Sequence, residues 1–90
     1  MSYTVTRVGA DGDPISLHPK SEEFTAESVE QAAQQWFALV VQRNEVDPDT
    51  LLDGVIHCRV TDSQGSHWFV ELERRFVPRY RTLSLSLIHI

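Results

Sequence analysis

The chain lacks most of the features from which a function can be read in a sequence. Its 90 residues include one cysteine, Cys58, and only four glycines and four prolines. A single cysteine excludes an internal disulfide, and it gives no zinc signature because a zinc site needs several ligands. No run of about 18 apolar residues occurs, so no membrane-spanning helix is predicted. Glycine-rich phosphate loops, nucleophile elbows and metalloprotease motifs are missing as well.

The start of the chain also lacks a secretory signal. Met1-Ser2-Tyr3 is followed neither by a basic segment nor by an apolar one. This predicts a cytoplasmic location and no membrane contact. In that compartment a lone cysteine on an apolar strand face is expected to be a small buried hydrophobic residue.

The composition is that of one small globular domain. Hydrophobic residues make up 41% of the chain and charged residues 23%, which is typical of a soluble protein. The formal charge of −5 is uneven, because residues 1–70 hold eleven acids and four bases, whereas residues 71–90 hold four arginines and two glutamates. An acidic body disfavours nucleic-acid binding over a broad surface. The basic C-terminal segment still leaves open a nucleic-acid contact confined to that segment.

One amphipathic helix is predicted from Val29 to about Arg43. Ser28 stands at the N-cap position and Gln31 three residues later, which is the spacing of a capping box. Asn44 is the expected stop at the other end. The apolar residues that recur at helical spacing are Val29, Ala32, Ala33, Trp36, Phe37 and Val40.

Strands are predicted on both sides of this helix. Residues 3–8 are rich in β-branched side chains, and after the turn cluster 9–14 an irregular second strand is expected between Ile15 and Ala26. Residues 55–61 and 66–73 alternate in polarity and form the strongest hairpin signal. The segment after Pro78 is expected to begin a further strand.

The hairpin register follows from matching the apolar faces of its two strands. A three-residue loop over 63–65, with Gly65 left-handed, places apolar residues opposite one another. It pairs Val60 with Trp68, Cys58 with Val70 and Ile56 with Leu72. On the other face it sets Arg59 opposite Phe69, His57 opposite Glu71 and Thr61 opposite His67.

The predicted fold is therefore α+β. One helix packs on one face of a roughly four-stranded antiparallel sheet, with the chain order β-β-α-β-β. The core combines the helix stripe and the apolar hairpin face with Val5 and either Ile15 or Leu17. The uncovered face carries an exposed Phe69, which makes that face the predicted contact surface.

The residues that suggest metal or nucleophilic chemistry do not converge. His57 and Cys58 are neighbours on a strand, so their side chains point to opposite faces. His67 is opposite Thr61 and not opposite His57. The sequence therefore predicts no catalytic, cofactor-binding or metal-binding residue and no cofactor.

A basic and aromatic stretch over residues 74–81 is the densest candidate for contact with a partner. Arginines interleaved with aromatic residues can pair with phosphates and stack on bases, or can form a protein-binding edge. They can equally satisfy the sheet surface beside Glu71 and Glu73. The candidate contact residues are Arg59, Phe69, Arg74, Arg75, Arg79, Tyr80 and Arg81.

The last six residues, Leu85–Ile90, have an unusual reading at the level of DNA. They are the translation of CTG TCT CTT ATA CAC ATC, which resembles the transposon end sequence ligated to DNA fragments in library preparation. One common adapter continues with a stop codon, and this chain also stops after Ile90. We expect residues 1–84 to form the domain, truncated at its C-terminus, and 85–90 to be adapter read-through from a shotgun or metagenomic fragment. The alternative is an ordinary apolar C-terminal strand.

Three functions stay open at this point. The first is a non-catalytic binding or regulatory module that contacts a protein partner or a second copy through its exposed sheet face or edge. The second is a nucleic-acid-contacting domain that uses the Arg74–Arg81 stretch. The third is an N-terminal fragment of a longer protein or enzyme whose catalytic residues lie beyond Ser84. The fold alone does not choose among them.

Overall fold

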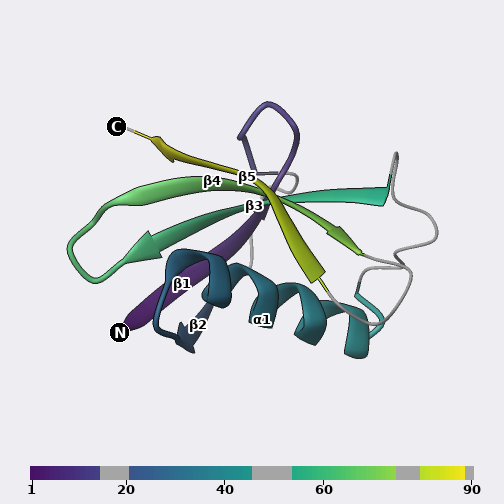
Figure 1. Cartoon of the computed structure of the whole chain (residues 1–90), viewed down its shortest axis with the longest axis horizontal. Coiled ribbons are helices and arrows are strands. Elements are labelled where there is room, and N and C mark those ends of the chain that lie inside the picture. The colour runs from purple at the N-terminus through teal and green to yellow at the C-terminus, as the bar shows by residue number, and fades with distance from the viewer. Residues whose placement is uncertain (15–20, 46–53, 75–79, 89–90) are drawn as a thin grey trace.

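The computed structural model of the chain describes residues 1–14, 21–45, 54–74 and 80–88 (Figure 1). In these segments one helix lies across one face of a five-stranded antiparallel sheet, which confirms the α+β prediction. The elements are β1 (Ser2–Val8), β2 (Ser21–Thr25), α1 (Val29–Gln42), β3 (Val55–Asp62), β4 (His67–Arg74) and β5 (Tyr80–Ile88). The strand order is β2-β1-β3-β4-β5, so β2 and β5 form the sheet edges. No helix in the described segments is long and apolar enough to cross a bilayer.

The N-terminus of α1 is closed by the predicted capping box, with one change. The Gln31 backbone N–H donates to Ser28 Oγ at 3.1 Å. The Gln31 side chain reaches back to the N–H of Glu27 at 2.6 Å, one residue earlier than the usual partner. Two backbone donors at the helix start are thereby satisfied.

The C-terminus of α1 lies at Asn44, the predicted stop, and this residue is left-handed. Asn44 has φ +58°. Its N–H donates to the carbonyl of Val41 at 3.1 Å, and the N–H of Glu45 donates to the carbonyl of Val40 at 3.0 Å. This pair of bonds is a Schellman motif, which satisfies carbonyls that the helix leaves without an internal donor. Arg43, just past the last helical residue, forms an ion pair with Glu22 of β2.

The β3–β4 hairpin has the predicted register. Val60 lies opposite Trp68, Cys58 opposite Val70 and Ile56 opposite Leu72. Gly65 has φ +86°, the conformation that the short loop requires. Asp62 organises the loop, because its Oδ1 accepts from the backbone N–H groups of Gln64 and Ser66, both at 2.9 Å.

β1 is an interior strand of the sheet and lies next to the β2 edge strand. β1 pairs antiparallel with β2 on one side and with β3 on the other, so Val5 lies between Glu22 and Val60. The second strand that was predicted between Ile15 and Ala26 is formed by β2, whereas residues 15–20 lie outside the described segments. The predicted core role of Ile15 or Leu17 is therefore not addressed.

The core lies between α1 and the sheet face toward it. Most predicted members are buried, but Val29 and Trp68 are only half-buried at its margin. Tyr3 and Ala26 join the core without having been predicted. The buried hydrophobic cluster consists of Tyr3, Val5, Ala26, Ala32, Ala33, Trp36, Phe37, Val40, Ile56, Cys58, Val60, Val70 and Leu72.

The fifth strand adds one to the roughly four that the sequence predicted. β5 pairs with β4, with Leu85 opposite Val70 and Leu87 opposite Trp68. The register shifts at Glu71/Leu72, where Leu83 is the extra residue of β5. The side chain of Gln34 in α1 donates to Thr82 Oγ1 at 3.4 Å and connects the helix to this strand.

Candidate protein-binding face

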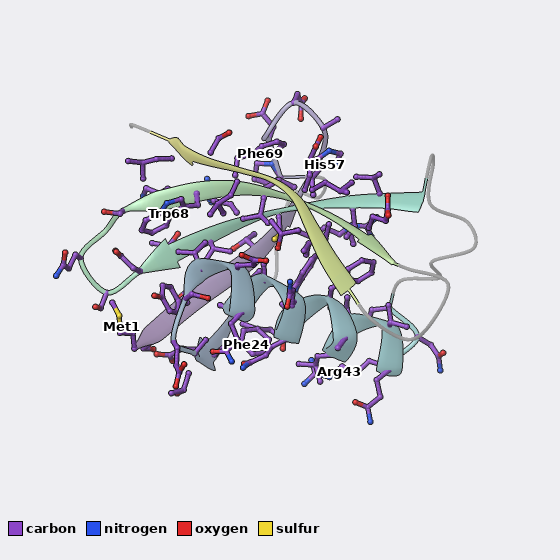
Figure 2. All side chains as sticks on the ribbon, viewed as in Figure 1. Met1, Phe24, Arg43, His57, Trp68 and Phe69 are labelled. Atoms are coloured by element: carbon purple, nitrogen blue, oxygen red, sulfur yellow. The ribbon has the colours of Figure 1, made fainter. Side chains whose placement is uncertain are left out.

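The sheet face opposite α1, which we call the outer face, carries a compact group of four side chains. His57 and Arg59 belong to β3, and Phe69 and Glu71 belong to β4. Arg59 is directly opposite Phe69 and His57 is directly opposite Glu71. All four are half-buried. We call these four residues the outer cluster, and Figure 2 shows His57 and Phe69 on the side of the sheet away from the helix.

Two contacts fix the orientation of His57 within the outer cluster. Its ring is stacked on Phe69, with ring centroids 5.3 Å apart and an interplanar angle of 18°. Its Nε2 lies 3.0 Å from Glu71 Oε1, so the imidazole N–H donates to the carboxylate. Together the two contacts favour the observed His57 rotamer, in which the imidazole lies against the Phe69 ring.

The neighbouring polar groups on the outer face are satisfied by one another. Thr61 Oγ1 and His67 Nδ1 are hydrogen-bonded at 2.8 Å. Thr6 Oγ1 and Ser21 Oγ are 2.6 Å apart and share a hydrogen bond. These two pairs lie beside the outer cluster. Because their side chains are hydrogen-bonded to each other, they offer a partner shape more than free donors and acceptors.

The outer face is partly covered by the turn over residues 9–14. Figure 1 shows this turn on the opposite side of the sheet from α1. It is closed by hydrogen bonds from Gly9 N–H to the Asp13 carbonyl at 2.8 Å and from Gly12 N–H to the Gly9 carbonyl at 2.9 Å. A Cβ built on Gly12 would lie 3.9 Å from Phe69 Cδ2, so the turn backbone passes close to that ring. Val8 is 2% exposed although it lies on this face.

The prediction of an exposed Phe69 is therefore wrong in degree. The ring is half-buried, because one side rests on His57 and the turn at Gly12 approaches another part. The alternation of polarity along β4 carries no information about a turn from another part of the chain that approaches the same face. Phe69 still lies on the outer face opposite Arg59, as the register required.

Arg59 is the cationic member of the outer cluster. Among the residues that the structure describes, its guanidinium forms no hydrogen bond or ion pair. It is half-buried between Thr6 on β1 and Phe69 on β4. Arginine beside an aromatic ring is a combination enriched at the centres of protein interfaces, where it pairs bidentately with carboxylates.

The arrangement does not support metal or thiol chemistry. No group of three or more His, Cys, Asp or Glu side chains in the described segments is placed to hold a metal ion. Cys58 is buried in the core on the opposite face from His57, and this burial raises the pKa of its thiol far above the ordinary value. A thiol that keeps its proton and has no access to solvent is a poor nucleophile.

No contact within the described segments connects the other predicted contact residues to the outer cluster. Arg75 and Arg79 lie outside the described segments. Arg74 and Tyr80 are placed by their backbone at one end of the β4–β5 pair, directly opposite each other, and Arg81 pairs with Glu73. The Arg74–Arg81 stretch therefore stays a prediction as a contact site.

Two members of the outer cluster were not among the predicted contact residues. His57 was considered a surface imidazole near Glu71, and that proximity is confirmed. The predicted register already set the His57–Glu71 pair directly beside the Arg59–Phe69 pair, and it could have identified His57 and Glu71 as members of the same surface.

The comparisons with known proteins give no family for this chain. No protein-family model, curated protein or solved structure matches it. The function must therefore be argued from the outer face itself.

Proposed function

We propose that this protein is a small, non-catalytic binding module that holds a segment of a partner protein against the outer face of its sheet. The observation that carries the proposal is the outer cluster, in which the fixed His57–Phe69 pair lies beside the Arg59 guanidinium. Its position on the face that α1 leaves uncovered supports a contact role. The buried, free thiol of Cys58 suits a reducing compartment, and we propose the cytoplasm as the site of action.

The chemistry of the outer cluster defines the partner segment. The aromatic pair offers a flat apolar surface that is suited to an aromatic or branched aliphatic side chain. Arg59 offers a planar set of donors that is suited to a carboxylate. The partner segment should therefore place an apolar residue next to an aspartate or glutamate.

The charges on the outer face favour a protein segment over a nucleic acid. Register places Glu23, Glu71 and Glu73 on this face, and Arg59 is the only arginine there whose side chain the structure describes. Phosphates spaced along a nucleic-acid backbone require several cations along one path. The nucleic-acid hypothesis then depends on the Arg74–Arg81 stretch and becomes an outcome of the test below.

A display selection with random peptides tests the proposal directly. The parent chain serves as bait, and Phe69→Asp serves as the counter-selection bait. Phe69→Asp removes the aromatic surface and adds a negative charge beside Arg59. Gln35→Asp is the matched control, because it adds the same charge at an exposed position of α1. Circular dichroism and urea unfolding confirm that each variant is folded before it is used.

The expected result is a set of peptides that carry an apolar residue next to an acid. They should bind the parent and Gln35→Asp equally, and bind Phe69→Asp and Arg59→Glu at least tenfold more weakly. Failure to enrich any peptide, or peptides that bind all four chains alike, would contradict the proposal. Labelled single-stranded RNA and DNA are titrated in parallel at low salt. Binding that weakens steeply with salt and persists in Phe69→Asp would favour the nucleic-acid hypothesis.

A further inference from the structure

The turn over residues 9–14 crosses the outer face from β1 to β4. It leaves β1 after Val8, which lies opposite His57 of β3. A Cβ built on Gly12 would be 3.9 Å from Phe69 Cδ2 on β4. Neighbouring strands are about 4.8 Å apart, so this contact lies about 10 Å from β1 and the turn passes over β3 to reach it. Figure 2 shows Phe69 beneath the turn, which therefore lies over the outer cluster.

The turn approaches β4 through a narrow contact. Gly12 is half-buried, whereas Ala10, Asp11 and Asp13 are exposed. Because Gly12 has no side chain, backbone atoms make the approach to Phe69 and little apolar surface is buried there. Hydrophobic stabilisation is roughly proportional to the apolar area removed from water. This contact therefore holds the turn against the ring only weakly.

The hydrogen bonds of the turn fix its shape and not its position over the sheet. The Gly9 N–H donates to the Asp13 carbonyl at 2.8 Å, and the Gly12 N–H donates to the Gly9 carbonyl at 2.9 Å. The Asp13 N–H donates to Asp11 Oδ1 at 3.0 Å. Within the segments that the structure describes, no hydrogen bond joins residues 9–13 to β3 or β4. The turn can therefore lift from the sheet as a unit with these bonds intact.

The turn and the proposed partner segment compete for the same place. Gly12 lies against the ring on which the apolar residue of the partner would pack. Asp11 and Asp13 are exposed carboxylates on the same turn. The partner segment brings a carboxylate toward Arg59, and like charges brought together oppose binding. Both the space that the turn occupies and its charge therefore disfavour a bound partner.

We propose that the turn over residues 9–14 is an autoinhibitory cover, which lies over Phe69 in the free protein and lifts from the ring when a partner segment binds. The inference rests on the proposed function in one respect, because the turn regulates that same site. When only a fraction of the molecules is open, the apparent dissociation constant rises by the reciprocal of that fraction. Removal of the cover therefore strengthens binding without any new contact.

Deletion of residues 10–12 removes the part of the turn that approaches Phe69. It leaves Gly9 and Asp13 between Val8 and Pro14, which already form a bridge at the base of the turn. A two-residue connection with glycine in the first position closes a hairpin as a type II′ turn. The deletion variant should therefore fold. Near-UV circular dichroism and the urea m-value confirm this before binding is measured.

The dye anilinonaphthalene sulfonate (ANS) tests the cover without an identified partner. ANS carries aromatic rings next to an anion, which is the chemistry expected of the partner segment. The deletion variant should bind ANS roughly fivefold more tightly than the parent, because its outer cluster is open in every molecule. Addition of Phe69→Asp should abolish the gain. Equal binding by the parent and the deletion variant, or a gain that survives Phe69→Asp, overturns the inference.

Two point variants repeat the test in a chain of unchanged length. Gly12 has φ +87° and Gly65 has φ +86°, a conformation that a β-branched residue strongly disfavours. Gly12→Val should displace the turn and strengthen ANS binding roughly twofold or more. Gly65→Val is the matched control, because it introduces the same strain in the β3–β4 loop and should leave ANS binding unchanged. Equal gains in both variants would show a response to strain in general and overturn the inference.

The peptides selected with the parent separate the cover from the proposed function. They should bind the deletion variant roughly fivefold more tightly than the parent. Selected peptides that bind both chains equally overturn the cover and leave the proposed function standing. A gain in ANS binding that depends on Phe69, combined with a selection that enriches no peptide, supports the cover and contradicts the proposed function.

Discussion

His57 stacks on Phe69, which is its diagonal neighbour across β3 and β4 and not the residue directly opposite it. The ring planes differ by 18° and the centroids are 5.3 Å apart. Diagonal pairs lie farther apart than opposite pairs, but aromatic side chains span the gap. The position opposite His57 is thereby left to Glu71, whose Oε1 lies 3.0 Å from His57 Nε2. One histidine thus makes both an aromatic contact and a hydrogen bond to a carboxylate.

A double-mutant cycle should detect this stacking as a coupling between the two rings. Phe69→Ala and His57→Ala should each lower the free energy of unfolding. The loss of unfolding free energy in the double variant should be smaller than the sum of the losses in the two single variants. The difference should be about 0.5–1.5 kcal/mol, as for other aromatic pairs. Urea unfolding monitored by tryptophan fluorescence provides the measurement.

The matching control replaces Glu71 with Gln, which keeps the hydrogen bond to His57 and removes the charge. The His57–Phe69 coupling measured in that background should be unchanged within error. A coupling near zero in both backgrounds would show that the two rings contribute to stability separately. It would contradict a His57–Phe69 pair that stabilises one arrangement of the outer cluster.

The thiol of Cys58 should be unreactive in the folded protein. The side chain is fully buried among core residues, and burial raises the pKa of the thiol. Ellman's reagent should therefore label Cys58 at the rate of global unfolding in native buffer, and at once in urea. Rapid labelling without denaturant would indicate that the β3–β4 face opens locally.

The same burial predicts a pH dependence of stability. The pKa of Cys58 is raised on folding, so above about pH 8.5 the unfolded chain loses a proton that the folded chain keeps. Stability from this group is complete below that pH and declines as the pH rises. The stability difference between the parent and Cys58→Ala should therefore shrink by about 1.4 kcal/mol per pH unit above about pH 8.5. A constant difference between pH 7 and pH 10 would contradict this prediction.

Replacement of Ser28 should show how much the helix start contributes. Ser28→Ala removes the acceptor for the Gln31 N–H and should cost about 1 kcal/mol of unfolding free energy. Ser28→Asp retains an acceptor and should stay within a few tenths of the parent. Equal losses in both variants would indicate that packing, and not the cap, fixes this end of α1. Thermal unfolding followed by far-UV circular dichroism gives the comparison.

Replacement of Asn44 tests the other helix end. Asn44 adopts φ +58°, which costs residues with a Cβ roughly 1–2 kcal/mol unless a short polar side chain offsets it. Asn44→Gly should equal or slightly exceed the parent in stability, whereas Asn44→Ala should fall about 1 kcal/mol below it. Urea midpoints that rank Ala above Gly would argue against a left-handed residue at this position.

The parts of the fold that sequence reasoning recovered are those fixed by local chemistry or by strict alternation. The capping residues Ser28 and Gln31 and the stop at Asn44 depend on side chains next to the backbone groups they satisfy. The β3–β4 register follows because a slip by one residue would turn Cys58 and its neighbours out of the core. The same register places Arg59 opposite Phe69, and these two residues are half of the outer cluster.

The features of the fold that could not be predicted from the sequence depend on contacts between distant segments. The approach of Gly12 to Phe69 joins a turn near the N-terminus to the fourth strand, and no periodicity encodes it. Tyr3 is buried because β1 is an interior strand with a neighbour on each side, which the alternation within β1 could not reveal. Trp68 is half-buried because it lies at the margin of the core, although its alternation is the same as that of buried Val70.

The interior position of β1 in the sheet has a consequence for synthesis. β1 leaves the ribosome before both of its sheet neighbours, β2 and β3, and β3 is encoded roughly half a chain later. Until Val55–Asp62 has emerged, one side of β1 has no neighbour from its own chain, and its non-local pairing delays completion of the sheet. A ribosome that pauses between α1 and β3 would therefore hold a nascent chain with an open backbone edge, at which chaperone binding or misassociation would compete with folding.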